Sequence, residues 1–290
     1  MPAVDGGPAD VVPTGRRLGL VLGGGGVAGV AWHTGVLCGL ADAGVDVTVA
    51  DLVVGTSAGA TVAAQVAGGR APDDLFRRQV DPTTLSTELM PRLPMAELWE
   101  LMAPIYTEAT DDADRRRRLG ALALSVDTVD ESVRRRVIEA RLEGLDWVGD
   151  RLRVVVVEAT SGDRRVLDVS SGVDLVDAVT ASCAVPGVWP PVTIDGSRYI
   201  DGGVWSVANV DLAVGCDRVL VLAPLVDPTV QQGIAGLGDA VRVELVAPDE
   251  SSMAAFGVDV LDPASREPSA RAGRAQGRLE AARVAALVSG

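Results

Sequence analysis

The sequence of 290 residues contains one histidine and no lysine. The only imidazole available for proton transfer is therefore that of His33, and metal sites built from several histidines are excluded. The three cysteines, Cys38, Cys183 and Cys216, are an odd number without the spacing of metal ligands, which excludes a zinc site and a disulfide framework. Cys38 and Cys183 lie in apolar stretches, where we expect reduced thiols in the core.

Long hydrophobic runs are also absent. The longest apolar stretch, residues 18–32, is interrupted by glycines and is too short to span a bilayer. Residues 1–17 are rich in Pro, Gly and Asp and contain no apolar signal-peptide core. We therefore expect a flexible tail over residues 1–16, a single domain over residues 17–290, and a cytoplasmic protein that makes peripheral contact with membranes.

Positive charge is scarce, because 26 arginines face 40 acidic residues and the formal net charge is -14. Such a balance argues against nucleic-acid partners and against lasting attachment to anionic bilayers. Arginine runs at residues 115–118 and 134–136 are surrounded by acidic residues, so we interpret both as solvated helix faces. Aromatic residues make up only 3% of the chain, so Ala, Val and Leu must build the core.

The pentapeptide Gly55-Thr56-Ser57-Ala58-Gly59 follows a short apolar run and precedes a helix-forming stretch. A serine between two glycines at a strand-to-helix junction is typical of a nucleophile elbow, because larger neighbours would collide in so sharp a turn. Ser57 would lie at the N-terminal end of the helix, where unpaired N–H groups favour developing negative charge. The pattern indicates acyl transfer with Ser57 as the nucleophile.

A run of four glycines, residues 23–26, follows another apolar strand pattern and opens a helix pattern. Successive N–H groups of such a run can point at one oxyanion. With Gly29, the same residues also satisfy the Gly-x-Gly-x-x-Gly fingerprint of dinucleotide binding, and Asp46 and Asp51 lie near the position of its acidic residue. The run alone leaves both alternatives open, and its occurrence with the serine elbow favours the oxyanion loop.

The base that accepts the proton of Ser57 has two candidates. His33 precedes the serine, whereas α/β-hydrolases place their histidine after it. Asp201 ends a short strand pattern and is followed by Gly202 and Gly203, which would allow a tight turn that aims the carboxylate at the elbow. An Asp-Gly pair is also a common hairpin turn, so this pair taken alone has a structural explanation.

These elements together resemble the patatin-like phospholipase family, lipid acyl hydrolases that use a Ser–Asp dyad. The resemblance rests on four blocks in the same order over residues 18–211. They are the loop Gly24-Gly25-Gly26-Val27-Ala28-Gly29, the elbow Gly55-Thr56-Ser57-Ala58-Gly59, the segment Ala181-Ser182-Cys183-Ala184-Val185-Pro186-Gly187 with Pro190-Pro191-Val192, and Asp201-Gly202-Gly203. The lack of a histidine after the serine is what this family predicts.

The resemblance implies a three-layer α/β fold with a mostly parallel central sheet flanked by helices. It also implies an oxyanion hole made by Gly24, Gly25, Gly26 and Val27. One position departs from the family, which commonly carries Arg or Lys where this sequence has Ala28. Backbone N–H groups would therefore stabilise the oxyanion without help from a cation.

In the mechanism that the resemblance implies, Asp201 takes the proton of Ser57 directly, and neither a metal ion nor another cofactor takes part. An unperturbed aspartate has a pKa of about 3.9, and burial would raise it toward neutral pH. We expect activity to depend on one acidic ionisation, without an imidazole step near pH ~6.5.

Strand patterns recur with helical patterns between them, which predicts a mostly parallel sheet. The expected strands are residues 18–22, 49–54, 152–159, 217–223 and 241–246, with a hairpin at 151–170 and helices at 174–183 and 264–288. Residues 70–145 form an insertion with a Met- and Trp-containing apolar cluster. We interpret this insertion as a lid or groove for substrate access, with ordinary helical core as the alternative.

The favoured function is a hydrolase that cleaves fatty-acyl esters of phospholipids or other lipids during transient contact with a membrane or micelle surface. Two alternatives stay open. One is an acyltransferase that uses the same site, and the other is a catalytically inactive lipid-binding or regulatory module. The sequence leaves the oligomeric state undetermined.

Overall fold

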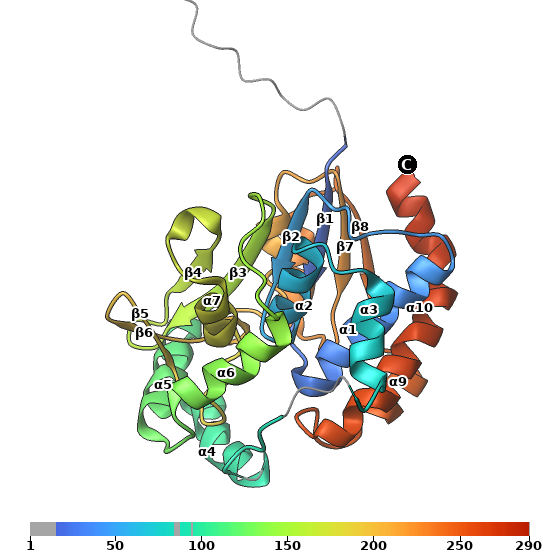
Figure 1. Ribbon diagram of the computed structural model, residues 1–290. Helices are drawn as coiled ribbons and strands as arrows, with labels where there is room; N and C mark the ends of the chain where they lie inside the picture. Colours follow the sequence, from blue (N-terminus) through green and yellow to red (C-terminus); the bar gives the residue numbers. More distant parts are fainter. Residues whose placement is uncertain (1–15, 84–87, 94, 290) are drawn as a thin grey trace, which may run out of the picture.

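A computed structural model describes residues 16–83, 88–93 and 95–289. The tail predicted for residues 1–16 lies outside the described residues except for Arg16. The described chain forms one sheet of eight strands with helices on both faces (Figure 1). This arrangement is the three-layer α/β fold that the sequence predicts.

The sheet is mostly parallel at its centre. Its strands are β1 (Leu18–Leu22), β2 (Leu52–Gly55), β3 (Leu152–Glu158), β4 (Arg164–Leu167), β5 (Val192–Ile194), β6 (Ser197–Asp201), β7 (Arg218–Leu222) and β8 (Arg242–Val246). The order is β5-β6-β3-β2-β1-β7-β8, and β4 also pairs with β3. Strands β3, β2, β1, β7 and β8 are parallel, whereas β4, β5 and β6 form an antiparallel flank.

The five predicted strands and the predicted β3–β4 hairpin are confirmed. The largest difference is at β2, which begins at Leu52 instead of residue 49. Residues 48–51 turn before the strand, and the carboxylate of Asp51 accepts a hydrogen bond from the N–H of Leu18 (2.8 Å). The turn thereby ties the entry of β2 to the entry of β1.

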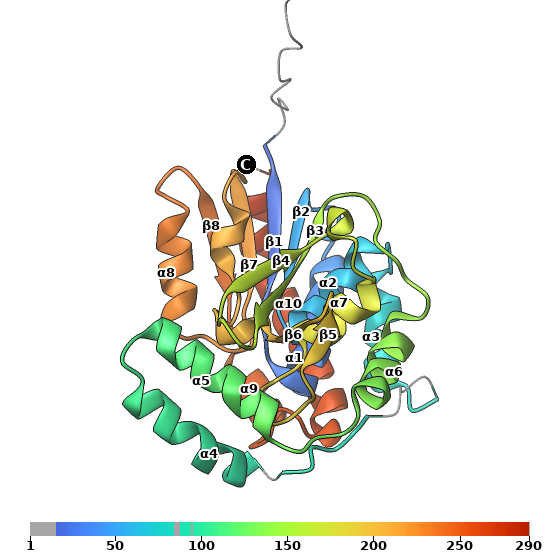
Figure 2. The same cartoon turned by 90° about the vertical axis from the view of Figure 1, so that its left-hand side faces the viewer.

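Ten α-helices lie in the described part of the chain. They are α1 (Gly26–Asp42), α2 (Ala58–Ala67), α3 (Pro72–Val80), α4 (Met95–Glu108), α5 (Asp112–Ser125), α6 (Glu131–Leu142), α7 (Leu175–Ser182), α8 (Pro228–Gly236), α9 (Glu250–Phe256) and α10 (Arg266–Ser289). Figure 2 shows α5 and α8 on one side of the sheet and α2, α3, α6 and α7 on the other. None of these described helices combines the length and apolarity needed to cross a membrane.

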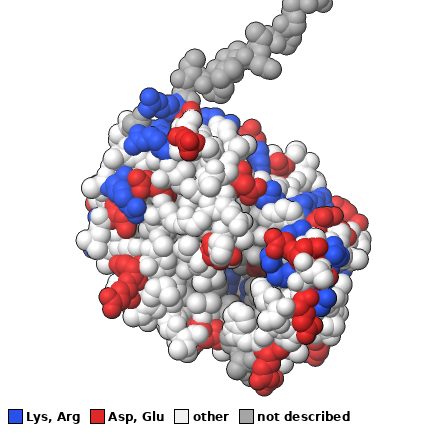
Figure 3. Space-filling view, turned by 180° about the vertical axis from the view of Figure 1, so that it is seen from behind, with Lys and Arg blue, Asp and Glu red and all other residues white. Residues whose placement is uncertain are grey.

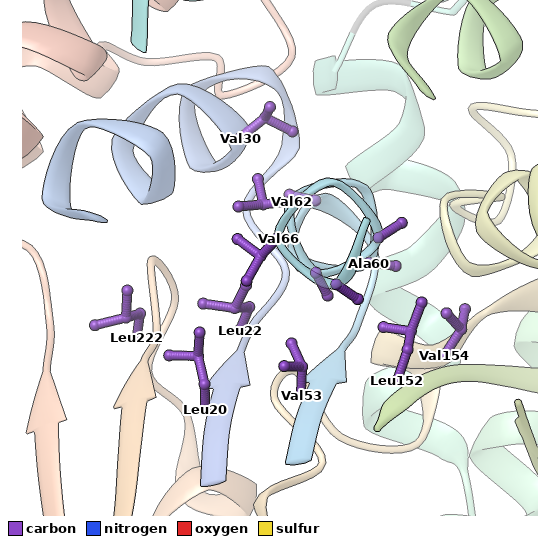
Figure 4. Packing of buried hydrophobic residues seen from close by; sticks show 14 of the residues in the cluster. Leu20, Leu22, Val30, Val53, Ala60, Val62, Val66, Leu152, Val154 and Leu222 are labelled. Atoms are coloured by element: carbon purple, nitrogen blue, oxygen red, sulfur yellow. The ribbon is translucent and has the colours of Figure 1, made fainter. Parts of the chain in front are cut away.

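The central strands are buried on both faces, which explains their continuous apolar sequences. Leu20 and Leu22 point toward α1 and α2 and pack in one cluster with Val62 (Figure 4). The intervening Val21 points the other way and packs with Val230 of α8. Alternate residues of one strand therefore serve two separate cores.

Helices α1 and α10 pack with their backbones in direct contact. A Cβ atom on Gly35 would lie 2.2 Å from the carbonyl oxygen of Ala270, and one on Gly277 would lie 2.4 Å from that of Val36. Any side chain at these positions would push the two helices apart. This contact fixes the position of α1, whose N-terminus carries the glycine loop.

The predicted insertion contains α3 to α6, and a buried ion cluster ties it to the rest of the fold. The carboxylate of Glu88 contacts the guanidinium groups of Arg134 (3.2 Å), Arg266 (3.1 Å) and Arg141. Arg134 also lies over the ring of Trp189 at 4.0 Å. The interpretation of residues 134–136 as a solvated face is therefore wrong at Arg134, because its partners lie far away in sequence.

Candidate active site

The strand register brings the two predicted catalytic side chains to one level of the sheet. On β3, Val154 pairs with Gly55 at the end of β2, and Val156 pairs with Asp201 at the end of β6. Ser57 follows Gly55 by two residues, the same step that separates Val156 from Val154. Asp201 therefore lies across β3 from the elbow, at the carboxyl ends of the parallel strands, where α/β proteins place their sites.

The elbow holds Ser57 in an uncommon conformation, with φ 54° and ψ −120°. Such angles are strained for a residue with a side chain and persist only where the surroundings enforce them. Both flanking glycines are required by close approach. A Cβ on Gly55 would lie 2.5 Å from the Cα of Ala60, and one on Gly59 would lie 2.0 Å from the carbonyl oxygen of Leu22.

Two side chains at the C-terminal end of α7 hold the backbone of Ser57. The N–H of Ser57 donates to Oγ of Ser182 (3.0 Å), and the thiol of Cys183 donates to the carbonyl oxygen of Ser57 (3.1 Å). Burial raises the pKa of Cys183 to about 11, so the thiol stays protonated and remains a donor. Cys183 is a free, buried thiol as predicted. The sequence did not indicate its contact with the elbow.

The glycine loop lies beside Ser57. Gly24, Gly25 and Gly26 line the same pocket as Ser57 and Asp201. A Cβ on Gly24 would lie 3.5 Å from the Cβ of Ser57. Gly26 adopts a φ of 64°, in the left-handed region that favours glycine.

The N–H groups of this loop fall into two sets. The N–H of Gly24 donates to the carbonyl oxygen of Val207 (2.7 Å), so the fold already uses it. Within the described residues, the N–H groups of Gly25, Gly26 and Val27 have no such backbone acceptor. Gly25 and Gly26 line the pocket of Ser57, whereas Val27 lines a different cavity.

Asp201 is buried, with 4% of the residue exposed, and it lines the mainly apolar pocket that also contains Ser57. Its Oδ1 accepts a hydrogen bond from the N–H of Gly203 (2.7 Å), while Oδ2 has no hydrogen-bond partner in the described part of the chain. Burial raises the pKa of Asp201 from 3.8 to about 7, and the nearby hydroxyl of Ser57 and the N–H of Gly203 oppose this rise. The free oxygen is available to accept a proton.

Asn209 connects the elbow to the turn after Asp201. Its buried Nδ2 donates to Oγ1 of Thr56 (3.1 Å) and to the carbonyl oxygen of Ser206 (2.7 Å), and lies 3.4 Å from that of Gly202. An asparagine between apolar residues gives no sequence indication of such a role. The amide of Asn209 thereby holds the elbow beside the turn that follows Asp201.

The side chain of His33 is fully buried in the core and does not line the pocket of Ser57. Its Nε2 lies 3.2 Å from the carbonyl oxygen of Leu222, to which a protonated Nε2 donates. Burial lowers the pKa of His33 to about 4, so the ring is neutral near pH 7.

The pocket around Ser57 has a volume of about 280 Å³ and is mainly apolar. Its lining includes Leu98, Met102, Leu119, Val185, Val188 and Leu261. None of the described lining residues is basic. Ala28, at the position where the family commonly carries Arg or Lys, is buried, and its N–H donates to the carbonyl oxygen of Val260. Such a lining suits an acyl chain. A larger cavity of about 610 Å³ among α1, α2, α3 and α6 is lined by charged residues and contains neither Ser57 nor Asp201.

Within the described residues, no cluster of three His, Cys, Asp or Glu side chains has the arrangement of a metal site.

Comparison with solved structures gives distant matches. VipD from Legionella pneumophila is 14% identical, with 84% of this chain and 54% of that chain covered and a TM-score of 0.39. The type III effector ExoU is 15% identical, with 92% and 53% covered and a TM-score of 0.40. Full-length ExoU from Pseudomonas aeruginosa in complex with SpcU is 15% identical, with 91% and 53% covered and a TM-score of 0.34. The chain thus spans about half the length of these proteins.

A comparison with curated protein sequences found no match. The model of the family described as patatin-like phospholipase matches residues 20–214, which is more than half of the chain and includes the glycine loop, the elbow and Asp201. The chain therefore belongs to the patatin-like phospholipase family.

Proposed function

We propose that the protein is a lipid hydrolase that cleaves fatty-acyl esters with a Ser57–Asp201 dyad and an oxyanion hole centred on Gly25 and Gly26. The observation that carries the proposal is the shared pocket, in which a strained serine, a buried carboxyl with one free oxygen and unbonded loop N–H groups adjoin. The neutral, buried His33 lies outside that pocket, which supports Asp201 as the base.

In the first step, Oδ2 of Asp201 accepts the proton of the Ser57 hydroxyl while Oγ attacks the ester carbonyl carbon. The N–H groups of Gly25 and Gly26 hold the negative oxygen of the tetrahedral intermediate. The intermediate collapses, Asp201 returns the proton to the departing alcohol, and the acyl group stays on Ser57. Hydrogen bonds between catalytic groups are often loose in unliganded enzymes and tighten when substrate binds.

In the second step, water attacks the acyl carbonyl and gives a proton to Asp201. Collapse of this intermediate releases the fatty acid, and the proton passes to Oγ of Ser57. The apolar pocket holds the acyl chain during both steps. The chemistry needs a carboxylate at the start of each step, which the pKa of about 7 provides in part at neutral pH.

The insertion of α3 to α6 supplies pocket residues from α4 and α5, which supports its predicted role in substrate access. Movement of this insertion as a lid, transient contact with a lipid surface and a cytoplasmic location stay predictions.

Labelling with a fluorophosphonate, followed by product analysis, tests the proposal. We expect the wild-type protein to be labelled and to release fatty acid from a lipid ester, whereas Ser57→Ala does neither and keeps its fold. Asp201→Asn should lose turnover by roughly 10⁴-fold. Transfer of the acyl group to an added alcohol, without net release of fatty acid, would identify an acyltransferase, and labelling at another residue would overturn the dyad.

A further inference from the structure

The mouth of the catalytic pocket carries large apolar side chains that the fold leaves half exposed. Trp99 and Tyr106 on α4 and Leu225 after β7 line the pocket with Ser57, yet they are 57%, 52% and 42% exposed. Trp99 and Tyr106 are seven residues apart, so they lie on the same side of the helix, two turns apart. A side chain that lines a catalytic pocket and also faces solvent forms part of the entrance.

Two further exposed valines lie close in sequence to residues that line the pocket. Val226 follows Leu225 and is 47% exposed, and Val258 lies two residues before the pocket residue Val260 and is fully exposed. Leu225 and Tyr106 line the same pocket, so the loop after β7 adjoins α4. We call the set Trp99, Tyr106, Leu225, Val226 and Val258 the mouth surface. Single exposed apolar residues are ordinary, but a group around a pocket marks a site of contact.

The charges around the mouth surface select the kind of contact. Helix α4 contains Glu97, Glu100 and Glu108 and no basic residue. Asp227 and Asp259 directly follow the two exposed valines. Arg115 of α5 also acts on the phenol of Tyr106, and its guanidinium group is paired with Asp112 (2.7 Å). Figure 3 shows acidic side chains along the lower margin of this face, with basic side chains beside them on the lower right. Glu108 pairs with Arg118 (3.8 Å), whereas Glu97 and Glu100 form no ion pair with another described residue.

We propose that the mouth surface docks on a lipid surface without net negative charge, such as a zwitterionic bilayer or an uncharged lipid particle, and is repelled by anionic bilayers. The proposal rests on the proposed lipid ester hydrolysis, because docking there places the pocket entrance against the acyl chains of the substrate. Apolar side chains gain free energy on leaving water, and the carboxylates of α4 would meet like charge on an anionic surface.

The test uses full-length protein with Ser57→Ala, so that lipid is not consumed. Vesicles of phosphatidylcholine, with and without added phosphatidylglycerol, are sedimented with the protein, and the bound fraction is measured. We expect binding to phosphatidylcholine and a several-fold loss when phosphatidylglycerol is added. Val226→Glu and Val258→Glu together should weaken binding by about tenfold or more.

The matched control is Val214→Glu. Val214 is 67% exposed and follows the 3₁₀ turn at residues 210–213, which packs near the start of β1 and away from the strand ends that carry the pocket. This substitution should leave vesicle binding unchanged. In an otherwise wild-type chain, Val226→Glu and Val258→Glu should also leave turnover of a dissolved short-chain ester unchanged, because neither residue lines the pocket.

Glu97→Arg with Glu100→Arg provides a gain-of-binding test. We expect this pair to raise binding to vesicles that contain phosphatidylglycerol, since the carboxylates that oppose anionic lipid become cations.

The results separate the two proposals. Cleavage of a dissolved ester without vesicle binding, or equal binding by the Val226 and Val258 variants, overturns the docking surface and leaves the hydrolase intact. Vesicle binding that depends on both valines, without ester cleavage by the wild type, supports the surface and overturns the proposed function. A concentration-dependent dimer that the valine substitutions abolish would assign the surface to a second copy of the chain and overturn lipid docking.

Discussion

The strand-end site and the α3 to α6 insertion hold their functional residues in different ways. At the strand ends, contacts of the backbone dominate. A Cβ added to Gly59 would lie 2.0 Å from the carbonyl oxygen of Leu22 in β1, and both the N–H and the carbonyl oxygen of Ser57 are hydrogen-bonded. In the insertion, side chains dominate, through the ion cluster of Glu88 and apolar contacts of α4 such as Leu98 with Trp189. The first region has little room to move, whereas the second keeps half-exposed apolar residues at the pocket.

The difference separates two tasks of such an enzyme. Catalytic groups need fixed positions, because misplacement of a reacting atom by about 1 Å can cost about 10²-fold in rate. A surface that receives lipid must adapt to chains of different shape, and Met and aromatic side chains supply that adaptability. The five predictions below each act on one of these two regions.

Glu88→Gln should loosen the insertion with the largest effect on stability. Three buried guanidinium groups would lose their shared carboxylate, which we expect to lower the free energy of unfolding by about 3–5 kcal/mol. Chemical denaturation at pH 7 measures the change. Asp127→Asn is the control, because the Asp127 side chain is 90% exposed and should matter by less than about 1 kcal/mol. An equally small effect of Glu88→Gln would contradict the cluster's role.

Gly25→Ala should damage the strand-end site while leaving the insertion in place. The added Cβ would lie 2.6 Å from the Cβ of Pro224, so the loop must shift, and we expect kcat/KM to fall by about 10²- to 10³-fold. Gly236→Ala at the end of α8 is the control, since a Cβ there meets nothing within 4 Å. Unchanged kcat/KM in a folded Gly25→Ala variant would remove the loop from the oxyanion hole.

The pH dependence of kcat/KM should report Asp201. Because burial raises its pKa to about 7, the rate should fall about tenfold per pH unit below that value and level off above it. The expectation from sequence is one acidic ionisation without an imidazole step near pH ~6.5. With the pKa of Asp201 raised to about 7, a step near neutral pH does not by itself distinguish an aspartate from a histidine. We therefore expect folded His33→Gln protein to keep the same pH profile of kcat/KM. If the step near pH 7 disappeared in that variant, His33 would be the base.

Asp201 should also affect stability, with the opposite sign to the usual aspartate. Between pH 3.8 and about 7 the unfolded chain releases this proton while the folded protein keeps it, so folding stability falls as pH rises through that window. Asp201→Asn should remove a penalty of up to about 4 kcal/mol above pH 7 and little of it near pH 4. Thermal unfolding at both pH values compares the variants.

Ser182→Ala should give the smallest effect of the series. Loss of the acceptor leaves the N–H of Ser57 buried without a partner, and we expect kcat to fall by about tenfold with little change in KM. Cys183→Ser retains a donor for the carbonyl of Ser57 and should keep more activity than Cys183→Ala. A wild-type kcat in all three variants would show that the hydrogen bonds from α7 do not position Ser57.

Local steric requirements explain what could be predicted from the sequence. The glycines around Ser57 and in the loop are demanded by contacts within a few residues or with adjacent strands, and such demands leave a short pattern. The apolar strands were predictable for the same reason, since each is buried on both faces. The structure places Ser57 and Asp201 in one pocket as expected, and their chemistry stays a prediction.

Partners distant in sequence explain what could not be predicted. Ser182 lies 125 residues from Ser57, and Asn209 lies 153 residues from Thr56. Glu88 meets Arg134 across 46 residues, so the arginine run was interpreted as a solvated face. Hydroxyl, amide and guanidinium groups of this kind occur throughout the chain, and only the fold determines which of them meet.

The close packing of α1 on α10 has a consequence for the region beyond the family match. Gly273 and Gly277 lie after residue 214, yet they allow α10 to touch the helix that begins with the glycine loop. A bulky residue at either position would push α1 away from α10 and shift the glycine loop that we propose as the oxyanion hole. A substitution in α10 would therefore reduce turnover although it lies far from the pocket, because displacement of α1 moves the loop at its N-terminus.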